Sequence, residues 1–247
     1  MKLKITALII AAITTVLPLA QATEFVLDWD LDANGNVIAA GQVISSPNDS
    51  ANPFNPGIPY SPYSDWGIDI QSYNSVLGVF DTALTFDSAN PTGGDWDLET
   101  SNPTLNNILI IGENFVDNDS NGLVDDPDDQ AGNPNAGYIE LFMNDWDATD
   151  TDITFVDIDS PGHTADFFLD SILVHSAMIP ALANGSVQTI SFNGFAFDQM
   201  KLSFGGSGGI GEIKLTQVPE PCTFVIFGVA GAAAWRRRRQ LPSVSTE

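Results

Sequence analysis

The chain has 247 residues, of which 32 are acidic and 8 basic, so its formal net charge is −24, and it contains one cysteine. These numbers exclude a nucleic-acid-binding protein, which needs a basic face, and a small scaffold held by disulfides, which needs paired cysteines. Because 43% of the residues are hydrophobic and 10% aromatic, we expect a folded acidic domain with a cationic partner, most simply a divalent metal.

Residues 1–22 have the pattern of a secretory signal peptide. Lys2 and Lys4 precede an apolar run over residues 8–19, and a small-x-small cleavage pattern ends at Ala22. We therefore expect cleavage after Ala22; a buried N-terminal helix is the alternative. Export agrees with the single Cys222, which has no partner for a disulfide within the chain.

Residues 23–217 are expected to form one acidic domain. Glu220 and Glu247 are the only acids outside this stretch, and Lys201 and Lys214 the only bases inside it, so its 30 acids and two lysines give a charge of −28. Short apolar runs broken by turn residues predict an all-β fold, an antiparallel β-sandwich or jelly roll, without a long amphipathic helix. The predicted strands are 24–29, 66–70, 76–86, 107–111, 138–142, 153–158, 167–174, 186–192, 200–204 and 210–215.

Four further patterns refine this prediction. Residues 152–159 alternate charged and apolar side chains, which is typical of a strand with one solvated face. Residues 45–64 contain five prolines and are expected to form a long loop, and residues 205–209 read GGSGG, which predicts a turn. The stretch from Asp30 to Gly35 begins like a calcium loop, but Asn34-Gly35 favours a plain hairpin turn.

Residues 117–128 have the spacing of a 12-residue calcium loop. Oxygen-bearing side chains fall at positions 1, 3, 5, 9 and 12, Gly122 at position 6, and Val124 at position 8 is expected to anchor the loop to the core. The loop resembles those of dockerins and EF-hands, but position 12 is an aspartate and the flanks do not look helical. A metal-free Asn/Asp/Gly connector is the alternative. The predicted ligands are Asp117, Asp119, Asn121, the carbonyl of Leu123, Asp125 and Asp128.

The C-terminus combines a proline-flanked motif, an uncharged apolar segment over residues 222–235 and four arginines. Fourteen residues of helix span only ~21 Å of a ~30 Å bilayer core, but the arginines favour a short transmembrane helix with residues 23–218 outside. A helix packed on the domain is the alternative. The motif residues are Pro219, Glu220, Pro221, Arg236, Arg237, Arg238 and Arg239, followed by a polar tail over residues 240–247.

Residues 218–239 resemble the PEP-CTERM sorting signal of exopolysaccharide-producing bacteria. This resemblance implies recognition by exosortase, a membrane transpeptidase, and removal of the tail after transient residence in the inner membrane. Residues 90–215 resemble, more diffusely, a β-rich secreted module that recurs ahead of such tails and has no established catalysis. The residues that carry this second likeness include Gly94-Asp95-Trp96-Asp97-Leu98, Pro127-Asp128-Asp129 and Asp157-Ile158-Asp159.

Catalysis is not indicated by any motif. His163 and His175 are the only histidines, expected in a turn and at a strand end, and neither belongs to a metal-protease motif. Four tryptophans, Trp29, Trp66, Trp96 and Trp146, each neighbour an aspartate, as in sugar-binding sites, although core packing explains the same pattern.

The sequence therefore predicts an exported, non-enzymatic, calcium-stabilised protein. Its expected destination is the cell surface or extracellular matrix, with exosortase as the sorting partner and exopolysaccharide as an associate. The alternatives are a glycan-binding module, which the tryptophans beside aspartates suggest, and a secreted glycoside hydrolase, for which paired carboxylates alone carry no weight because 30 acids make some pair inevitable.

Overall fold

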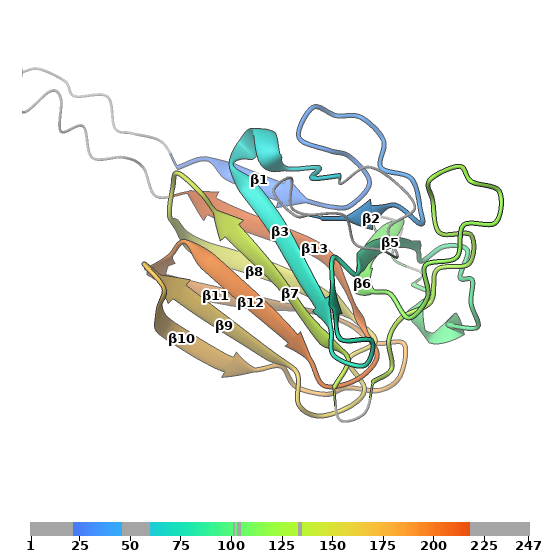
Figure 1. Ribbon diagram of the computed structural model, residues 1–247. Coiled ribbons are helices and arrows are strands. Elements are labelled where there is room, and N and C mark those ends of the chain that lie inside the picture. The colour runs from blue at the N-terminus through green and yellow to red at the C-terminus, as the bar shows by residue number, and fades with distance from the viewer. Residues whose placement is uncertain (1–21, 46–59, 101, 103–104, 133–134, 218–247) are drawn as a thin grey trace, which may run out of the picture. The chain divides into compact units, whose positions relative to one another are not determined.

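The computed structural model describes residues 22–45, 60–100, 102, 105–132 and 135–217, and they form two antiparallel β-sheets (Figure 1). The helices within these residues are two single 3₁₀ turns, η1 (Ser64–Trp66) and η2 (Trp96–Leu98). The all-β prediction is confirmed, as is the absence of a long amphipathic helix from this part of the chain. None of the helices described there is long and apolar enough to cross a membrane.

The first sheet has seven strands. Its order is β11-β8-β13-β6-β5-β2, with β1 paired to β13. The strands are β1 (Glu24–Leu27), β2 (Val43–Ile44), β5 (Ala83–Asp87), β6 (Asn107–Ile111), β8 (Ala148–Val156), β11 (Val187–Phe197) and β13 (Gly209–Gln217).

The second sheet has six strands in the order β10-β9-β12-β7-β3-β4. The strands are β3 (Ile68–Asn74), β4 (Val79–Phe80), β7 (Gly137–Met143), β9 (Thr164–Leu169), β10 (Ile172–Met178) and β12 (Gln199–Phe204). All pairings in both sheets are antiparallel, so the connections are hairpins and longer returns rather than helical crossovers.

The main core lies between the two sheets, which is a sandwich-like arrangement. Strand β3 alternates strictly, so that Ile68 and Ile70 are buried while their neighbours are half-buried. They belong to one buried cluster with Leu141 of the same sheet and with Leu109 and Ile213 of the other. Alternation along strands thus directs one face of each sheet onto the other.

Several predicted strands need correction. Residues 167–174 are not one strand but parts of β9 and β10, because Asp170 and Ser171 turn the chain with φ of 51° and 65°. His175 consequently lies within β10 and not at a strand end. Residues 76–86 likewise divide into β4 and β5, and β2 was not predicted.

The predicted solvated face of residues 152–159 is only partly present. Asp152 is exposed, but residues 153–156 are all buried, and Asp157 follows them with 1% of its surface exposed. The reason is that this end of β8 is covered on both faces: Ile153 and Phe155 belong to the main core, and Val156, which points the other way, belongs to a second buried cluster. Residues 205–208 of the GGSGG segment connect β12 to β13, whereas Gly209, predicted as part of the turn, is the first residue of β13.

Several predictions fall outside the described residues. These are most of the signal peptide, residues 46–59 of the proline-rich loop, and the whole C-terminal signal with its motif, apolar segment and arginines. Residues Ala22–Val218 cluster into one compact unit.

Candidate metal sites

The loop over residues 117–128 brings three of its predicted ligands together. Asp117, Asp119 and Asp125 each offer a carboxylate oxygen, and these oxygens lie within 4.8 Å of one another. The backbone N–H of Asn121 donates to Asp117 Oδ1 and Asp119 Oδ1, at 3.1 Å each, and the N–H of Gly122 donates to Asp117 Oδ2 at 2.9 Å. The loop therefore curls around its first aspartate. We call these three aspartates the loop cluster.

Val124 anchors the loop, as the sequence predicts. Its side chain is 3% exposed and belongs to a buried cluster that includes Leu84 and Phe86. Its N–H donates to the carbonyl of Gly41 at 2.8 Å, and the N–H of Asp125 donates to Val116 at 2.9 Å. The position of Asp125 thus follows from the packing of its neighbour.

The other predicted ligands have different places. The amide oxygen of Asn121 accepts the N–H of Leu123 at 2.8 Å, and its Nδ2 donates to Asp119 Oδ2 at 3.0 Å, so this side chain shapes the turn. Asp128 is not in the loop cluster. Its carbonyl accepts the N–H of Glu113 at 2.9 Å, next to the antiparallel bridge between Gly112 and Asp129, so its backbone belongs to the closing end of the loop.

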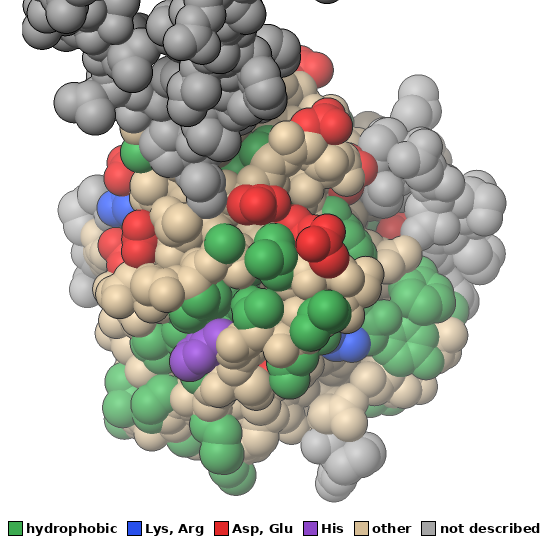
Figure 2. Space-filling view, turned by 90° about the vertical axis from the view of Figure 1, so that its left-hand side faces the viewer, with side chains coloured by type: hydrophobic (Ala, Val, Ile, Leu, Met, Phe, Trp, Pro, Cys, Tyr) green, Lys and Arg blue, Asp and Glu red, His purple; other side chains and the backbone are tan. Residues whose placement is uncertain are grey.

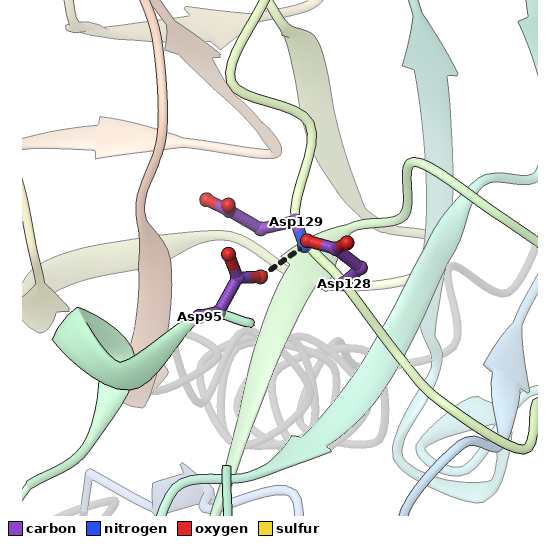
Figure 3. A group of neighbouring side chains, drawn as sticks. All are labelled: Asp95, Asp128 and Asp129. Carbon is purple, nitrogen blue, oxygen red and sulfur yellow. Dashed lines mark hydrogen bonds between the residues drawn. The ribbon is translucent and has the colours of Figure 1, made fainter. Parts of the chain in front are cut away.

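Asp128 instead lies with Asp95 and Asp129, in what we call the interior cluster (Figure 3). Carboxylate oxygens of these three residues also lie within 4.8 Å of one another. Asp95 stands just before η2, and its Oδ2 accepts the backbone N–H of Asp129 at 2.7 Å. Sequence reasoning missed this cluster, although Gly94-Asp95 and Pro127-Asp128-Asp129 both appear among the residues of the diffuse likeness.

Donors from a third segment hold the interior cluster. Asp129 is 4% exposed, and its Oδ2 accepts the N–H of Gly208 at 2.6 Å and the hydroxyl of Ser207 at 2.9 Å. The same hydroxyl lies 3.1 Å from Oδ2 of the buried Asp157, whose Oδ1 accepts the N–H of Gly185 at 2.6 Å. The Ser207 hydroxyl therefore lies between Asp129 and Asp157, and the backbone N–H groups of Gly208 and Gly185 hold these two carboxylates in place.

The pKa values in this cluster are raised. Burial, followed by the hydrogen bond and charge of Asp95, raises the pKa of Asp128 to about 7. Burial also raises the pKa of Asp129 to about 7, against the opposing effect of its bonds to Gly208 and Ser207. The pKa values of Asp95 and Asp157 are raised as well, again mainly by burial. A cation would remove this penalty by replacing the protons.

The stretch that begins at Asp30 forms a turn. Leu31 and Val37 form an antiparallel bridge, and Oδ1 of Asp32 accepts the N–H groups of Asn34 and Asn36 at 2.9 and 2.8 Å. Hydrogen bonding, chiefly from the Asn36 side chain, lowers the pKa of Asp32. The predicted hairpin turn is confirmed.

The four tryptophans separate into two kinds. Trp29 is fully buried, and Trp66 and Trp146 pack against Phe25 at the edge of the core, with the indole N–H of Trp146 donating to the carbonyl of Trp66 at 2.9 Å. Trp96, between Asp95 and Asp97, is 70% exposed. Core packing therefore accounts for three of the four, and only Trp96 presents its ring to solvent.

A hollow of about 250 Å³ lies beside the loop cluster. Carboxylates from two segments line it, since Asp125 lies on the loop over residues 117–128 and Asp87 is the last residue of β5. The hollow is lined by Ala40, Asp87, Asn90, Thr92, Val124, Asp125 and Pro127.

Comparison with known proteins does not assign a family: no protein-family model matches the chain, and no curated protein matches it. The functional interpretation therefore rests on the residues and the geometry.

Proposed function

We propose that this chain is an exported, non-enzymatic protein of the cell surface or extracellular matrix, stabilised by calcium and sorted by exosortase through its C-terminal signal. The observation that carries the calcium part is the closure of residues 117–128, which places three carboxylates at ligand spacing over a buried anchor. Several hard oxygens at such a site suit Ca²⁺. The export part rests on the residue patterns at the two ends.

A calcium role also explains why so much negative charge is gathered in one region. Two clusters of three aspartates, joined by residues 125–128, concentrate charge that would repel if all groups were ionised and no cation were bound. Bound calcium would stabilise the folded chain because the unfolded chain does not hold these oxygens together.

Thermal unfolding with and without a chelator tests the calcium proposal. At a free calcium concentration of 100 times the dissociation constant, binding adds about 2.7 kcal/mol to the free energy of unfolding, which is roughly 5–10 °C for a domain of this size. We expect Asp119→Ala to abolish the calcium-dependent shift and Asp145→Ala, at an exposed aspartate outside both clusters, to retain it. An equal shift in all three proteins would contradict the assignment to this loop.

Cell fractionation tests the sorting proposal. Replacing Arg236, Arg237, Arg238 and Arg239 by glutamine should disturb membrane orientation or processing, because positive charge keeps the flank of an apolar helix on the cytoplasmic side. The matched control replaces Lys201 and Lys214 by glutamine. Normal release of the arginine variant would count against the sorting signal.

A glycan-binding role is the second candidate, and the exposure of Trp96 favours it. Trp96 lies between Asp95 and Asp97 in the sequence, and an exposed aromatic ring is suited to stack on a sugar while neighbouring carboxylates bind its hydroxyls. Glycan arrays with the wild type and Trp96→Ala test this role, with Trp29 left intact because it belongs to the core. A reducing-sugar assay on the bound glycans distinguishes retention from hydrolysis.

A further inference from the structure

Four asparagines of the chain are followed directly by glycine, and such pairs are chemically labile. Glycine has no Cβ, so its backbone nitrogen can closely approach the side-chain amide carbon of the preceding asparagine. Asparagine accordingly counts among the thermolabile residues. The reaction also requires that both groups are free to move, so the fold decides which pair can react. The four pairs are Asn34-Gly35, Asn121-Gly122, Asn184-Gly185 and Asn193-Gly194.

In the first three pairs, hydrogen bonds hold both of the groups that would react. The side-chain Nδ2 of the asparagine donates to an aspartate carboxylate at 2.7–3.0 Å. The N–H of the glycine donates to a backbone carbonyl or a carboxylate at 2.6–2.9 Å. These bonds must break before the nitrogen can reach the amide carbon, so the three pairs are protected. In chain order, the acceptors for the asparagines are Asp65, Asp119 and Asp97, and those for the glycines are Asp32, Asp117 and Asp157.

The fourth pair, Asn193-Gly194 on β11, lacks this protection. Both residues are exposed, and no hydrogen bond holds the Asn193 side chain within the part of the chain that the structure describes. The pairing of β11 with β8 shifts between Asn193 and Phe197, so residues 194–196 have no partner in register on β8. A Cβ at Gly194 would meet nothing within 4 Å, which leaves room for a ring to form there.

We propose that Asn193 is a site of spontaneous deamidation. The backbone nitrogen of Gly194 attacks Cγ of Asn193, and the new N–C bond closes a succinimide ring. The bond between Cγ and Nδ2 breaks, and the amide group leaves as ammonia with the proton that Gly194 gives up. Water then opens the ring at either carbonyl, which leaves aspartate or isoaspartate at position 193. The reaction consumes only water, so the exposed pair needs no enzyme.

The product loosens this end of β11. Asn193 lies directly opposite Asp150 on β8, and like charges directly opposite each other destabilise a strand pair. Figure 2 views the molecule from the side where β10 and β11 lie, and it shows acidic side chains gathered above hydrophobic ones, so a further carboxylate adds to negative charge already present. Phe192 and Phe195 flank the pair and pack on Phe167 with ring centroids 4.9 and 5.1 Å apart. Movement of β11 therefore disturbs these aromatic contacts.

Peptide mapping by mass spectrometry, during incubation of the folded full chain at pH 8, tests the site. We expect Asn193 to deamidate at least about tenfold faster than Asn34 and Asn184, because a factor of ten is about 1.4 kcal/mol, the scale of one hydrogen bond. In the chain unfolded by urea the four rates should become similar, since every one of these asparagines precedes glycine. The proposal fails if Asn193 reacts no faster than the other two in the folded chain, or if its lead is as large in urea.

Two variants test the consequence for β11. Asn193→Asp carries the charge of the product and should lower the melting temperature by about 1–4 °C, with a smaller difference at high salt because exposed charges are screened. Asn193→Gln keeps an amide and should leave the melting temperature unchanged. It should also suppress the reaction at position 193, since the longer side chain would have to close a larger ring. Equal melting temperatures for the two variants would contradict the loosening of β11.

Discussion

The loop cluster and the interior cluster each bring three carboxylates close together, but the repulsion between these groups is reduced in different ways. In the loop cluster, Asp117 and Asp119 lie near solvent and accept N–H groups of their own loop. In the interior cluster, Asp128 and Asp129 have pKa values raised by burial, so that protons reduce the repulsion there. The difference shows that local backbone donors can hold carboxylates together near water, whereas buried carboxylates need a proton or a cation.

The largest expected effect comes from Gly41, whose backbone contacts Val124, the residue that anchors the loop to the core. In Gly41→Ala, the new Cβ would lie 2.3 Å from the carbonyl oxygen of Val124, and φ is +77°. Left-handed backbone with a side chain costs about 1–2 kcal/mol, and overpacking costs about 1–3 kcal/mol more. We expect a loss of about 3 kcal/mol in the free energy of unfolding, together with weaker calcium binding, measured by denaturant unfolding and calorimetry.

Gly35→Ala is the control for this experiment. Gly35 has nearly the same φ, +78°, but a Cβ there meets nothing within 4 Å. It should therefore show only the backbone cost and leave calcium binding unchanged. Equal losses in the two variants would mean that contact with Val124 does not hold the loop.

The second effect is the pH dependence of the metal-free protein. Since the pKa values of Asp128 and Asp129 are raised from 3.8 to about 7, the folded chain keeps protons that the unfolded chain releases. Their contribution to stability is complete below about pH 4 and is lost as the pH rises to about 7. We expect a loss of a few kcal/mol, most of it from the buried Asp129, because one pKa unit corresponds to about 1.4 kcal/mol and solvent screens the half-buried Asp128.

Urea unfolding between pH 4 and pH 8, in the presence of a chelator, measures this slope. Asp129→Asn keeps an acceptor for the N–H of Gly208 and should flatten the curve, whereas Asp119→Asn should not. The same measurement is then made with calcium in place of the chelator. If calcium removes the dependence of the unfolding free energy on pH, it binds at the interior cluster. If calcium raises the unfolding free energy equally at every pH, it binds at the loop cluster alone. An unchanged slope in Asp129→Asn would contradict the role of buried protons.

The loop cluster could be predicted because all its determinants are local. The spacing of Asp117, Asp119 and Asp125 is visible in the sequence, as is the apolar Val124 between them. The interior cluster could not, because Asp95 and Asp129 are brought together by long-range folding and held by Gly208 from a third segment. Their burial depends on the whole sandwich.

The strands, too, were predicted correctly in some places and missed in others. Strand β6 was predicted at its observed bounds, since its apolar run ends at polar residues on both sides. The turn between β9 and β10 was missed because both of its residues, Asp170 and Ser171, have left-handed φ values, and Ser171 is not among the Gly, Asn and Asp residues that favour such turns. That error also hid β10 as an edge strand.

The smallest predicted effect is on calcium affinity, and it tests whether Asp128, at position 12 of the loop, acts with the loop cluster or with the interior cluster. Asp125→Asn removes a charge from the loop cluster and should weaken calcium binding about tenfold, which is about 1.4 kcal/mol. Asp128→Asn should leave binding at the loop unchanged, because the Asp128 carboxylate faces Asp95 and Asp129. Titration calorimetry at pH 8 measures both. If Asp128→Asn weakens binding as much as Asp125→Asn does, calcium draws position 12 into the loop cluster, and the two groups of carboxylates form one site when the cation is bound.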